Sequence, residues 1–376
     1  MEDNPNWVVP LLQPSLPELS VVKPLLESID KSCSYTNHGP IEHQLREALA
    51  EKFNRTSSDE VALFSSGTSA MQACIRTWQL PPGERCLVPS WTFVATAAAI
   101  ATSGLEPCFI DVDAVTWTPT PETLEQSIDK FSAKAAVIVS PFGGSLDYKA
   151  LCDLAERKNI KILIDAAASH HWVETICLQR MPLKLPIMMS LHATKSISSI
   201  EGGTILYDDI DAVSQMIGIS NFGIYNLKPV NHIGFNGKLS EFHSAYGLQS
   251  LKQWPQHKAR MLHLVTEYLN MLRSANVPCT FAPNLLENLA SSTFNIQTTI
   301  SAPAIVEMLK SKGIQAKRWW KDGVHAFEAY QAFPSDNLQV TKNLAKHVIG
   351  LPLFHCISEE QQETVVDCLK NELAGN

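Results

Sequence analysis

Short apolar runs alternate with helix-length segments through the first half of the chain, and this alternation constrains the fold more than any other feature. Five apolar runs of strand length recur roughly every 20–30 residues, at 61–64, 86–88, 108–110, 135–139 and 162–164. Helical patterns fill the intervals, at 68–79, 92–102, 121–127 and 148–157. Because parallel strands need long crossover connections, usually helices, the alternation predicts an α/β fold with a mainly parallel sheet and crossover helices.

Two further strands are expected at 188–191 and 204–207, close enough in sequence to pair antiparallel. Before the first strand, residues 1–40 are rich in proline and predicted irregular, and Pro40 suits the first turn of a helix. We therefore expect a large α/β domain with an N-terminal arm over residues 1–250.

The pattern changes after about residue 239. A long helical pattern covers 239–273, with a kink or break expected at Trp254-Pro255 because proline lacks the N–H that a helix uses. Strands are predicted at 293–298 and 315–319, and helices at 302–312 and 359–373. Residues 251–376 thus form a smaller α+β domain in this interpretation.

Composition excludes several classes of protein. The net charge of -8, without any basic run, disfavours nucleic acid and anionic membrane surfaces as partners. The longest apolar stretch, at 94–102, is too short to span a membrane, and the N-terminus shows no signal peptide. Nine scattered cysteines without a CxxC pair argue against a disulfide framework or a zinc site and fit a reducing, cytoplasmic environment.

Three loops that follow predicted strands hold residues capable of chemistry. The first, Ser65-Ser66-Gly67-Thr68-Ser69-Ala70, opens a helix, where free N–H groups and the helix dipole favour an anion. Ser66 or Thr68 as a plain helix N-cap explains that loop equally well. The second holds Asp165, a carboxylate at a strand end that is also compatible with capping a turn.

The third loop, Ser190 to Lys195, precedes Glu201-Gly202-Gly203. Lysines are usually solvated surface residues, but Lys195 lies between two apolar strands and beside small residues. A desolvated lysine has a lowered pKa and becomes a useful nucleophile.

Taken in order, these motifs resemble the DegT/DnrJ/EryC1/StrS aminotransferases, enzymes of fold type I that use pyridoxal 5'-phosphate (PLP) to aminate nucleotide-linked keto sugars. The resemblance runs from Tyr35 into the C-terminal region. It is carried by the stretches at 35–40, 66–70, 88–96 (VPSWTFVAT), 164–167 (IDAA), 190–195 with 201–203, and 234–241 (GFNGKLSE).

The resemblance implies a role for each matching residue. Lys195 would form the Schiff base with PLP and shuttle the proton, and Asp165 would pair with the pyridinium nitrogen. Phe93 would stack on the ring. The phosphate would be bound by Thr68, Ser69 and Ser190, and by Asn236 of the neighbouring subunit in a homodimer with shared active sites. Substrate would contact Tyr35, Asn37, Lys238 and Arg318, while Trp319-Trp320 is equally compatible with core packing and His192 with a structural role.

One position departs from the family. Three residues after the aspartate, where Gln or His usually touches the ring 3-hydroxyl, this chain has Ala168. His170, His171 or a water is a possible substitute for that contact.

The implied reaction moves an amino group from L-glutamate to a nucleotide-linked keto sugar, a dTDP-4-keto- or 3-keto-6-deoxyhexose. The alternatives are a PLP- or PMP-dependent sugar dehydratase, disfavoured because Lys195 is present, and a non-catalytic relative, disfavoured because Asp165 is also present. A hydrolase built on Asp165, His170 and His171 is weaker still. No GxSxG motif exists, and adjacent histidines on a strand would point to opposite faces.

Overall fold

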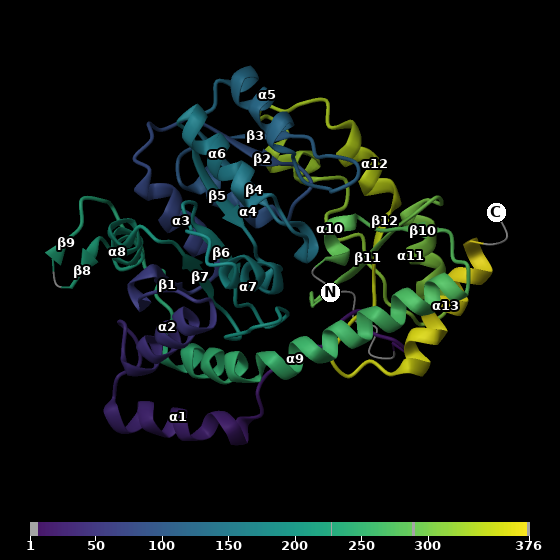
Figure 1. Cartoon of the computed structure of the whole chain (residues 1–376), viewed down its shortest axis with the longest axis horizontal. Helices are drawn as coiled ribbons and strands as arrows, with labels where there is room; N and C mark the ends of the chain where they lie inside the picture. Colours follow the sequence, from purple (N-terminus) through teal and green to yellow (C-terminus); the bar gives the residue numbers. More distant parts are fainter. Residues whose placement is uncertain (1–6, 227, 288–289, 374–376) are drawn as a thin grey trace.

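A seven-stranded sheet forms the centre of the computed structural model, which describes residues 7–226, 228–287 and 290–373 (Figure 1). The strand order is β1-β7-β6-β5-β4-β2-β3. Its strands are β1 (Val61–Phe64), β2 (Arg85–Pro89), β3 (Glu106–Ile110), β4 (Ala135–Val139), β5 (Lys161–Asp165), β6 (Ile187–Ser190) and β7 (Gly203–Leu206).

The mainly parallel sheet predicted from the sequence is confirmed. Strands β2 to β6 pair parallel, whereas β7 lies antiparallel between β6 and β1. The carboxyl ends of β5 and β6 therefore meet at one edge of the sheet. Because β7 runs antiparallel to β6, it begins at the same edge. Asp165 and Ser190 close these two neighbouring strands.

Helices cover both faces of the sheet because alternate side chains of each strand point to opposite sides. In β1, Val61 and Leu63 join one buried cluster and Ala62 and Phe64 the other. The first cluster takes side chains from α2 (Pro40–Lys52), α5 (Pro121–Phe131), α6 (Tyr148–Lys158) and α7 (His170–Leu178). The second takes them from α3 (Gly67–Thr77), α4 (Val94–Thr102) and α8 (Ile210–Ile219).

A second sheet of three antiparallel strands lies at the other end of the molecule. It consists of β10 (Cys279–Thr280), β11 (Phe294–Thr298) and β12 (Val348–Leu351), and its neighbours are α10 (Pro283–Leu286), α11 (Ala302–Ser311), α12 (Gln339–His347) and α13 (Glu359–Leu373). The long helix α9 (Glu241–Ser274) runs from the large sheet to this one (Figure 1). The expected division at residue 250 falls inside α9 and stays a prediction.

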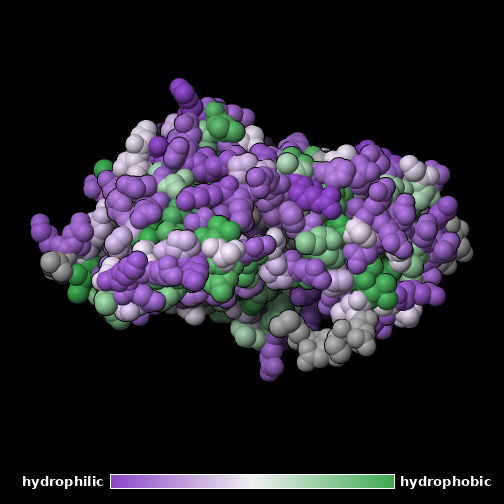
Figure 2. Space-filling model, turned by 90° about the horizontal axis from the view of Figure 1, so that it is seen from below, coloured by the Kyte–Doolittle hydropathy of each residue, from purple (hydrophilic) through white to green (hydrophobic). Residues whose placement is uncertain are grey.

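The remaining elements are short or peripheral. They are α1 (Leu19–Ser32), the hairpin strands β8 (Ile224–Tyr225) and β9 (Lys228–Pro229), and the 3-10 turns at Ser58–Glu60, Pro141–Gly143, Val324–Ala326 and Glu328–Tyr330. Among the described helices, none combines the length and apolarity needed to cross a membrane. The face drawn in Figure 2 is mostly hydrophilic, with hydrophobic side chains in separate small groups.

The prediction that residues 1–40 are irregular was wrong for the segment that forms α1. Its Val22 and Ile29 are buried against Ile41 of α2 and Ala245 of α9. The seven-residue spacing of Val22 and Ile29 is two helical turns, but the surrounding prolines obscured that pattern.

In the C-terminal part, one prediction was wrong and another was wrong in part. No break occurs at Pro255: helix α9 continues through it, beside Trp254, which is fully buried and donates its indole N–H to Glu174 at 3.1 Å. The alternative expected there, a kink, stays a prediction. The strand expected at 315–319 is absent; Lys317 makes one isolated bridge to Gly350, and the ring of Trp319 packs beside that glycine. Tertiary contacts decide both cases.

Candidate active site

Lys195 lies in the loop between β6 and β7, at the sheet edge where Asp165 ends the neighbouring strand. Its backbone N–H donates to the His192 carbonyl at 2.9 Å, and Ser199 donates to the Leu191 carbonyl at 2.7 Å, so the loop is folded tightly on itself. Burial lowers the pKa of the Lys195 amine, partly opposed by the Asp165 carboxylate. The loop thus holds a lysine that loses its proton more easily than a surface lysine, as a nucleophile requires.

Asp165 is 5% exposed, and both of its carboxylate oxygens are held. Thr96 Oγ1 donates to one oxygen at 2.8 Å, and the Ala167 N–H donates to the other at 3.1 Å. Burial raises the pKa of Asp165, opposed by Thr96, Ala167 and the charge of Lys195. A carboxylate in such a place favours a cationic partner, and a protonated pyridine nitrogen fits it in charge and size.

Thr96 is a residue that the sequence analysis missed. Besides Asp165, its hydroxyl bonds Thr92 Oγ1 at 2.9 Å, so the first turn of α4 positions the carboxylate. Phe93, the N-cap of the same helix, is 61% exposed at this corner and leaves its ring available for stacking. Within the helix expected at 92–102, the four-residue spacing of Thr92 and Thr96 was the available signal, although in the structure Thr92 lies just before the N-cap of α4.

The loop that opens α3 caps the helix and also leaves backbone N–H groups that can bind an anion. Ser66 is the N-cap and forms a reciprocal capping box with Ser69, whose N–H and hydroxyl are both engaged. The N–H groups of Gly67 and Thr68 precede the first intrahelical bond and remain for an anion. Thr68 is therefore better placed than Ser69 to bind a phosphate directly, and Ser69 fixes the loop.

Two glycines bring this loop against the lysine loop. A side chain at Gly203 would lie 2.5 Å from the Ser66 carbonyl oxygen and 2.6 Å from the Gly67 nitrogen. A side chain at Gly67 would lie 3.5 Å from the Ser190 Cβ. Ser190 is therefore beside the loop that opens α3, and only glycine at 203 allows the two backbones to approach so closely.

His170 and His171 open helix α7 and do not lie on a strand, which corrects the geometry used to argue against a hydrolase. His170 is 1% exposed, and neither ring nitrogen has a partner in hydrogen-bond geometry among the described residues. Ala168 precedes this helix in a partly buried turn and adds no hydrogen-bonding side chain. His192 bonds Thr194 Oγ1 at 2.9 Å, which agrees with a structural role.

The loops expected to contact substrate lie around the start of α9. Tyr35 is 45% exposed, stacks on Phe242 at 5.9 Å, and accepts a backbone hydrogen bond from Glu241 at 3.0 Å. Asn37 is exposed with a φ of 65°. Asn236 is also exposed, and its neighbour Gly237 accepts from the Ser65 N–H of the same chain at 2.7 Å.

The two cations expected near substrate differ in their freedom. Lys238 Nζ lies 4.6 Å from the centre of the Phe222 ring, and partial burial lowers its pKa. The Arg318 guanidinium is already hydrogen-bonded within the chain: it donates to the Ala345 carbonyl at 3.0 Å and to Asp322 at 2.7 Å. Trp320 stacks on Phe142 with ring centres 4.0 Å apart, which favours the core-packing interpretation of that tryptophan.

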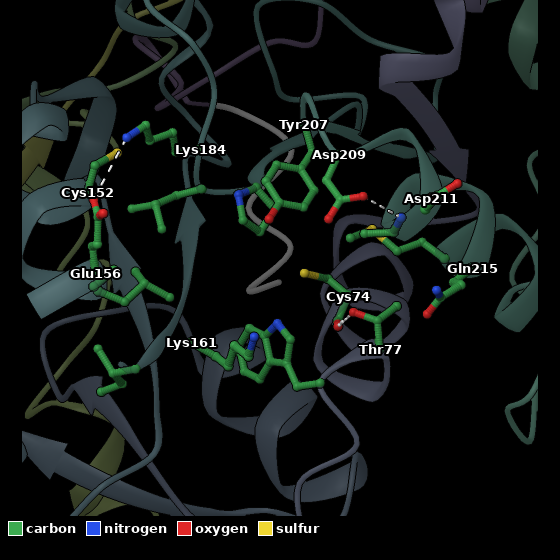
Figure 3. Close-up of a pocket in the computed structure, with 18 of the residues that line it drawn as sticks. Cys74, Thr77, Cys152, Glu156, Lys161, Lys184, Tyr207, Asp209, Asp211 and Gln215 are labelled. Atoms are coloured by element: carbon green, nitrogen blue, oxygen red, sulfur yellow. Dashed lines mark hydrogen bonds and ion pairs between the residues drawn. The ribbon is translucent and has the colours of Figure 1, made fainter. Parts of the chain in front are cut away.

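A cavity of about 610 Å³ lies at the opposite edge of the sheet from Lys195, where β5 begins and β7 ends. In Figure 3 the side chains of Cys74 and Tyr207 project toward its centre, and Lys184, Glu156, Asp209 and Asp211 stand around it. Lys184 pairs with Glu156 at 3.8 Å, and Asp209 caps α8. Lys184, Glu156 and Asp209 therefore have structural roles in the wall of this cavity.

Comparison with known proteins agrees with this geometry. Residues 22–370 match the DegT/DnrJ/EryC1/StrS aminotransferase family. A dTDP-4-amino-4,6-dideoxy-D-glucose transaminase of Shigella dysenteriae is 27% identical over 365 residues, 95% of this chain and 97% of the relative.

Solved structures agree as well. A protein of Bacillus cereus ATCC 10987 described as a PLP-dependent aminotransferase superposes with a TM-score of 0.88 at 25% identity, covering 96% of this chain and 99% of its own. NtdA of Bacillus subtilis, solved with bound cofactor PMP, gives 0.84 at 22% identity, covering 95% and 82%. The chain therefore belongs to the DegT/DnrJ/EryC1/StrS aminotransferase family and is a fold type I transaminase that uses PLP.

Proposed function

We propose that this transaminase transfers the amino group of L-glutamate to a nucleotide-linked keto sugar, releasing 2-oxoglutarate and an amino sugar. The favoured acceptor is a dTDP-4-keto- or 3-keto-6-deoxyhexose. Bound PLP supplies a ring that carries the amino group between the two substrates and takes up negative charge from the reacting carbon.

The observation that carries the proposal is the apposition of Lys195 and Asp165. A lysine with a lowered pKa and a buried carboxylate come from neighbouring strand ends, each acting on the pKa of the other. Lys195 binds the cofactor covalently through its amine and, once released, moves a proton to and from the substrate carbon. Asp165, oriented by Thr96, keeps the ring nitrogen protonated.

The remaining site residues divide between cofactor and substrate in this proposal. The N–H groups of Gly67 and Thr68 and the hydroxyl of Ser190 bind the phosphate, Ser69 holds the loop, and Phe93 stacks on the ring. Tyr35, Asn37 and Lys238 face the sugar nucleotide, whose diphosphate suits an ammonium group. Arg318 enters this set only if substrate displaces Asp322, since its guanidinium is already paired.

The choice of a sugar acceptor rests on the relatives. The Shigella dysenteriae protein, which this chain matches over 95% of its length, is a dTDP-amino-sugar transaminase. The presence of Lys195 supports transamination over dehydration, because this chain keeps the amine that releases and recaptures the cofactor.

A homodimer with shared sites completes the proposal, with Asn236 of each chain reaching the phosphate of its neighbour. Exposed apolar side chains around Asn236 support a protein contact there: Phe222 is 62% exposed and Ile233 88%. Burying such side chains contributes roughly 1.5–3 kcal/mol each.

Nine free cysteines, four of them fully buried, support a reducing compartment such as the cytoplasm.

A panel of nucleotide keto sugars with L-glutamate as donor tests the proposal. We expect one or more dTDP-keto sugars to gain an amino group, read as a mass shift and located on the ring by NMR, with 2-oxoglutarate formed in equal amount. The Lys195→Ala protein is the control for uncatalysed amination. Turnover of keto acids alone, with every keto sugar unchanged, would contradict the sugar assignment.

A further inference from the structure

A small cavity lies directly against Lys195, on the side formed by α9, the segment after β12 and the N-terminal segment. Its volume is about 30 Å³. Its walls include Lys195 and Thr194 of the lysine loop, His257 of α9, His355 after β12, and Gln13. A space of this size holds water molecules but not a substrate, and its polar walls give such waters partners.

Two imidazoles form one wall of this cavity. The rings of His257 and His355 stack with centres 5.2 Å apart and planes at 15°. Burial and the neighbouring His355 lower the pKa of His257 to about 4, while burial and Arg260 lower the pKa of His355. Both rings are therefore neutral near pH 7, and each carries one N–H donor and one acceptor nitrogen.

A third imidazole, His170, lies close enough to Lys195 and His257 for both to influence it. Burial first, and then the charges of Lys195 and His257, lower its pKa to about 3, opposed by the Ser190 carbonyl. Its ring nitrogens have no partner in hydrogen-bond geometry among the described residues. A fully buried imidazole without such partners is costly unless a water or another group completes it.

Among the residues that the structure describes, no carboxylate lines this cavity. The charged groups that face the set are Lys195 itself, Asp165 from β5, and Arg260 near His355. Lys195 must gain and lose a proton in each turnover, yet desolvation lowers the pKa of its amine, and among the described residues the carboxylate that acts on that amine, Asp165, serves the ring nitrogen. A route for that proton therefore has to run through neutral groups that both accept and donate.

We propose that His170, His257 and His355, together with water in this cavity, carry the proton of Lys195 between its amine and solvent. The protonated Lys195 nitrogen gives its proton to the acceptor nitrogen of a neutral imidazole or to water, and the N–H on the far side of that ring passes its own proton on. His355, which is partly exposed and lies beside the N-terminal segment, completes the exchange with solvent. The role rests on the proposed function of Lys195, and these histidines act through it as positioning residues.

The test is a pH jump on the PLP-bound protein, followed by the visible band that reports protonation of the Lys195 nitrogen. In the His257→Phe/His355→Phe protein, which keeps two stacked rings, we expect the relaxation to slow by about tenfold or more, as for loss of a general acid–base group. The equilibrium midpoint should stay near that of the parent, because the rings are neutral. His263→Phe, an exposed position on the same helix, is the matched control.

Two outcomes would overturn the proposal: an unchanged relaxation in the double variant, or an equal slowing in the His263→Phe control. His170→Gln gives an independent check that avoids the stacked pair, and it should also slow the relaxation. The measurement needs no sugar. A protein that shows the band but no keto-sugar turnover would contradict the proposed function and leave this inference standing. Normal keto-sugar turnover by the parent, with unchanged relaxation in the double variant, would support the proposed function and contradict this inference.

Discussion

The two edges of the central sheet differ: one holds the larger cavity, and the other holds the groups suited to catalysis. One edge holds a cavity of about 610 Å³, in whose wall Lys184 pairs with Glu156 and Asp209 caps α8. The other holds only about 30 Å³ beside Lys195, but there a lysine, a carboxylate and three imidazoles have pKa values shifted by burial. Burial also shifts the pKa values of Cys74, Cys152 and Tyr207 in the large cavity, so a desolvated amine beside a buried carboxylate marks the reactive edge, rather than volume or shifted pKa values alone.

Removing the lysine should have the largest effect. Lys195→Ala should lower kcat/KM by about 10⁴-fold or more, because the nucleophile and proton carrier are lost together. Pyridoxamine phosphate should still bind, measured by absorbance after gel filtration. Normal turnover of this variant would remove Lys195 from the mechanism.

Neutralising the buried carboxylate should come next. Asp165→Asn keeps the size of the side chain but removes the counter-charge of the ring nitrogen, so kcat should fall about 10²–10³-fold. The exposed Asp153, which pairs with Lys149, provides the control Asp153→Asn, expected to stay within twofold. Equal kcat values for the two variants would contradict the role of Asp165.

The glycine contact tests how the phosphate cradle is built. Gly203→Ala places a methyl 2.5 Å from the Ser66 oxygen and should cost about 1–3 kcal/mol, seen as a lower Tm and weaker PLP binding. Gly202→Ala meets only side-chain atoms, the nearest at 3.2 Å, and should do less harm. If Gly203→Ala matches the parent in both measurements, the close approach of the two loops is not required.

Removing one hydroxyl should have a smaller effect. Thr96→Val deletes the donor to Asp165 and should cost about 1–2 kcal/mol of transition-state stabilisation, roughly tenfold in kcat. Thr96→Ser retains the donor and should recover most of the activity. Equal losses in both variants would show that packing, and not the hydrogen bond, matters at this position.

The smallest effect is expected at the opposite edge of the sheet. Tyr207→Phe and Lys184→Ala, in the wall of the large cavity, should change kcat/KM less than about twofold and stability by about 0.5 kcal/mol or less. A tenfold loss of activity with an intact cofactor band would mean that this edge communicates with Lys195, and the contrast between the edges would fail.

The sequence predicted the central sheet well because its strands are fully buried apolar runs with helices between them. Lys195, Asp165 and the loop at Ser66 follow those strands, so their meeting at one edge was predictable from strand direction. The α1 helix, the unbroken α9 and the single bridge at Lys317 depend on contacts between distant segments, which local patterns do not contain.

The same limit applied to the site. The bond from Thr96 to Asp165 joins residues 69 positions apart, and the histidine pair joins α9 to the segment after β12. No local spacing brings these groups together. Arg318, in contrast, resembled a substrate ligand in sequence, and only the structure reveals its partners, Asp322 and the Ala345 carbonyl.

The most direct test of the account is chemical trapping of the cofactor on the protein. Borohydride reduction of the PLP-bound protein, followed by proteolysis and mass spectrometry, should place one phosphopyridoxyl group per chain on Lys195 and bleach the visible band. A label on another lysine, or reduced protein without any label, would contradict the assignment of Lys195 as the residue that holds the cofactor.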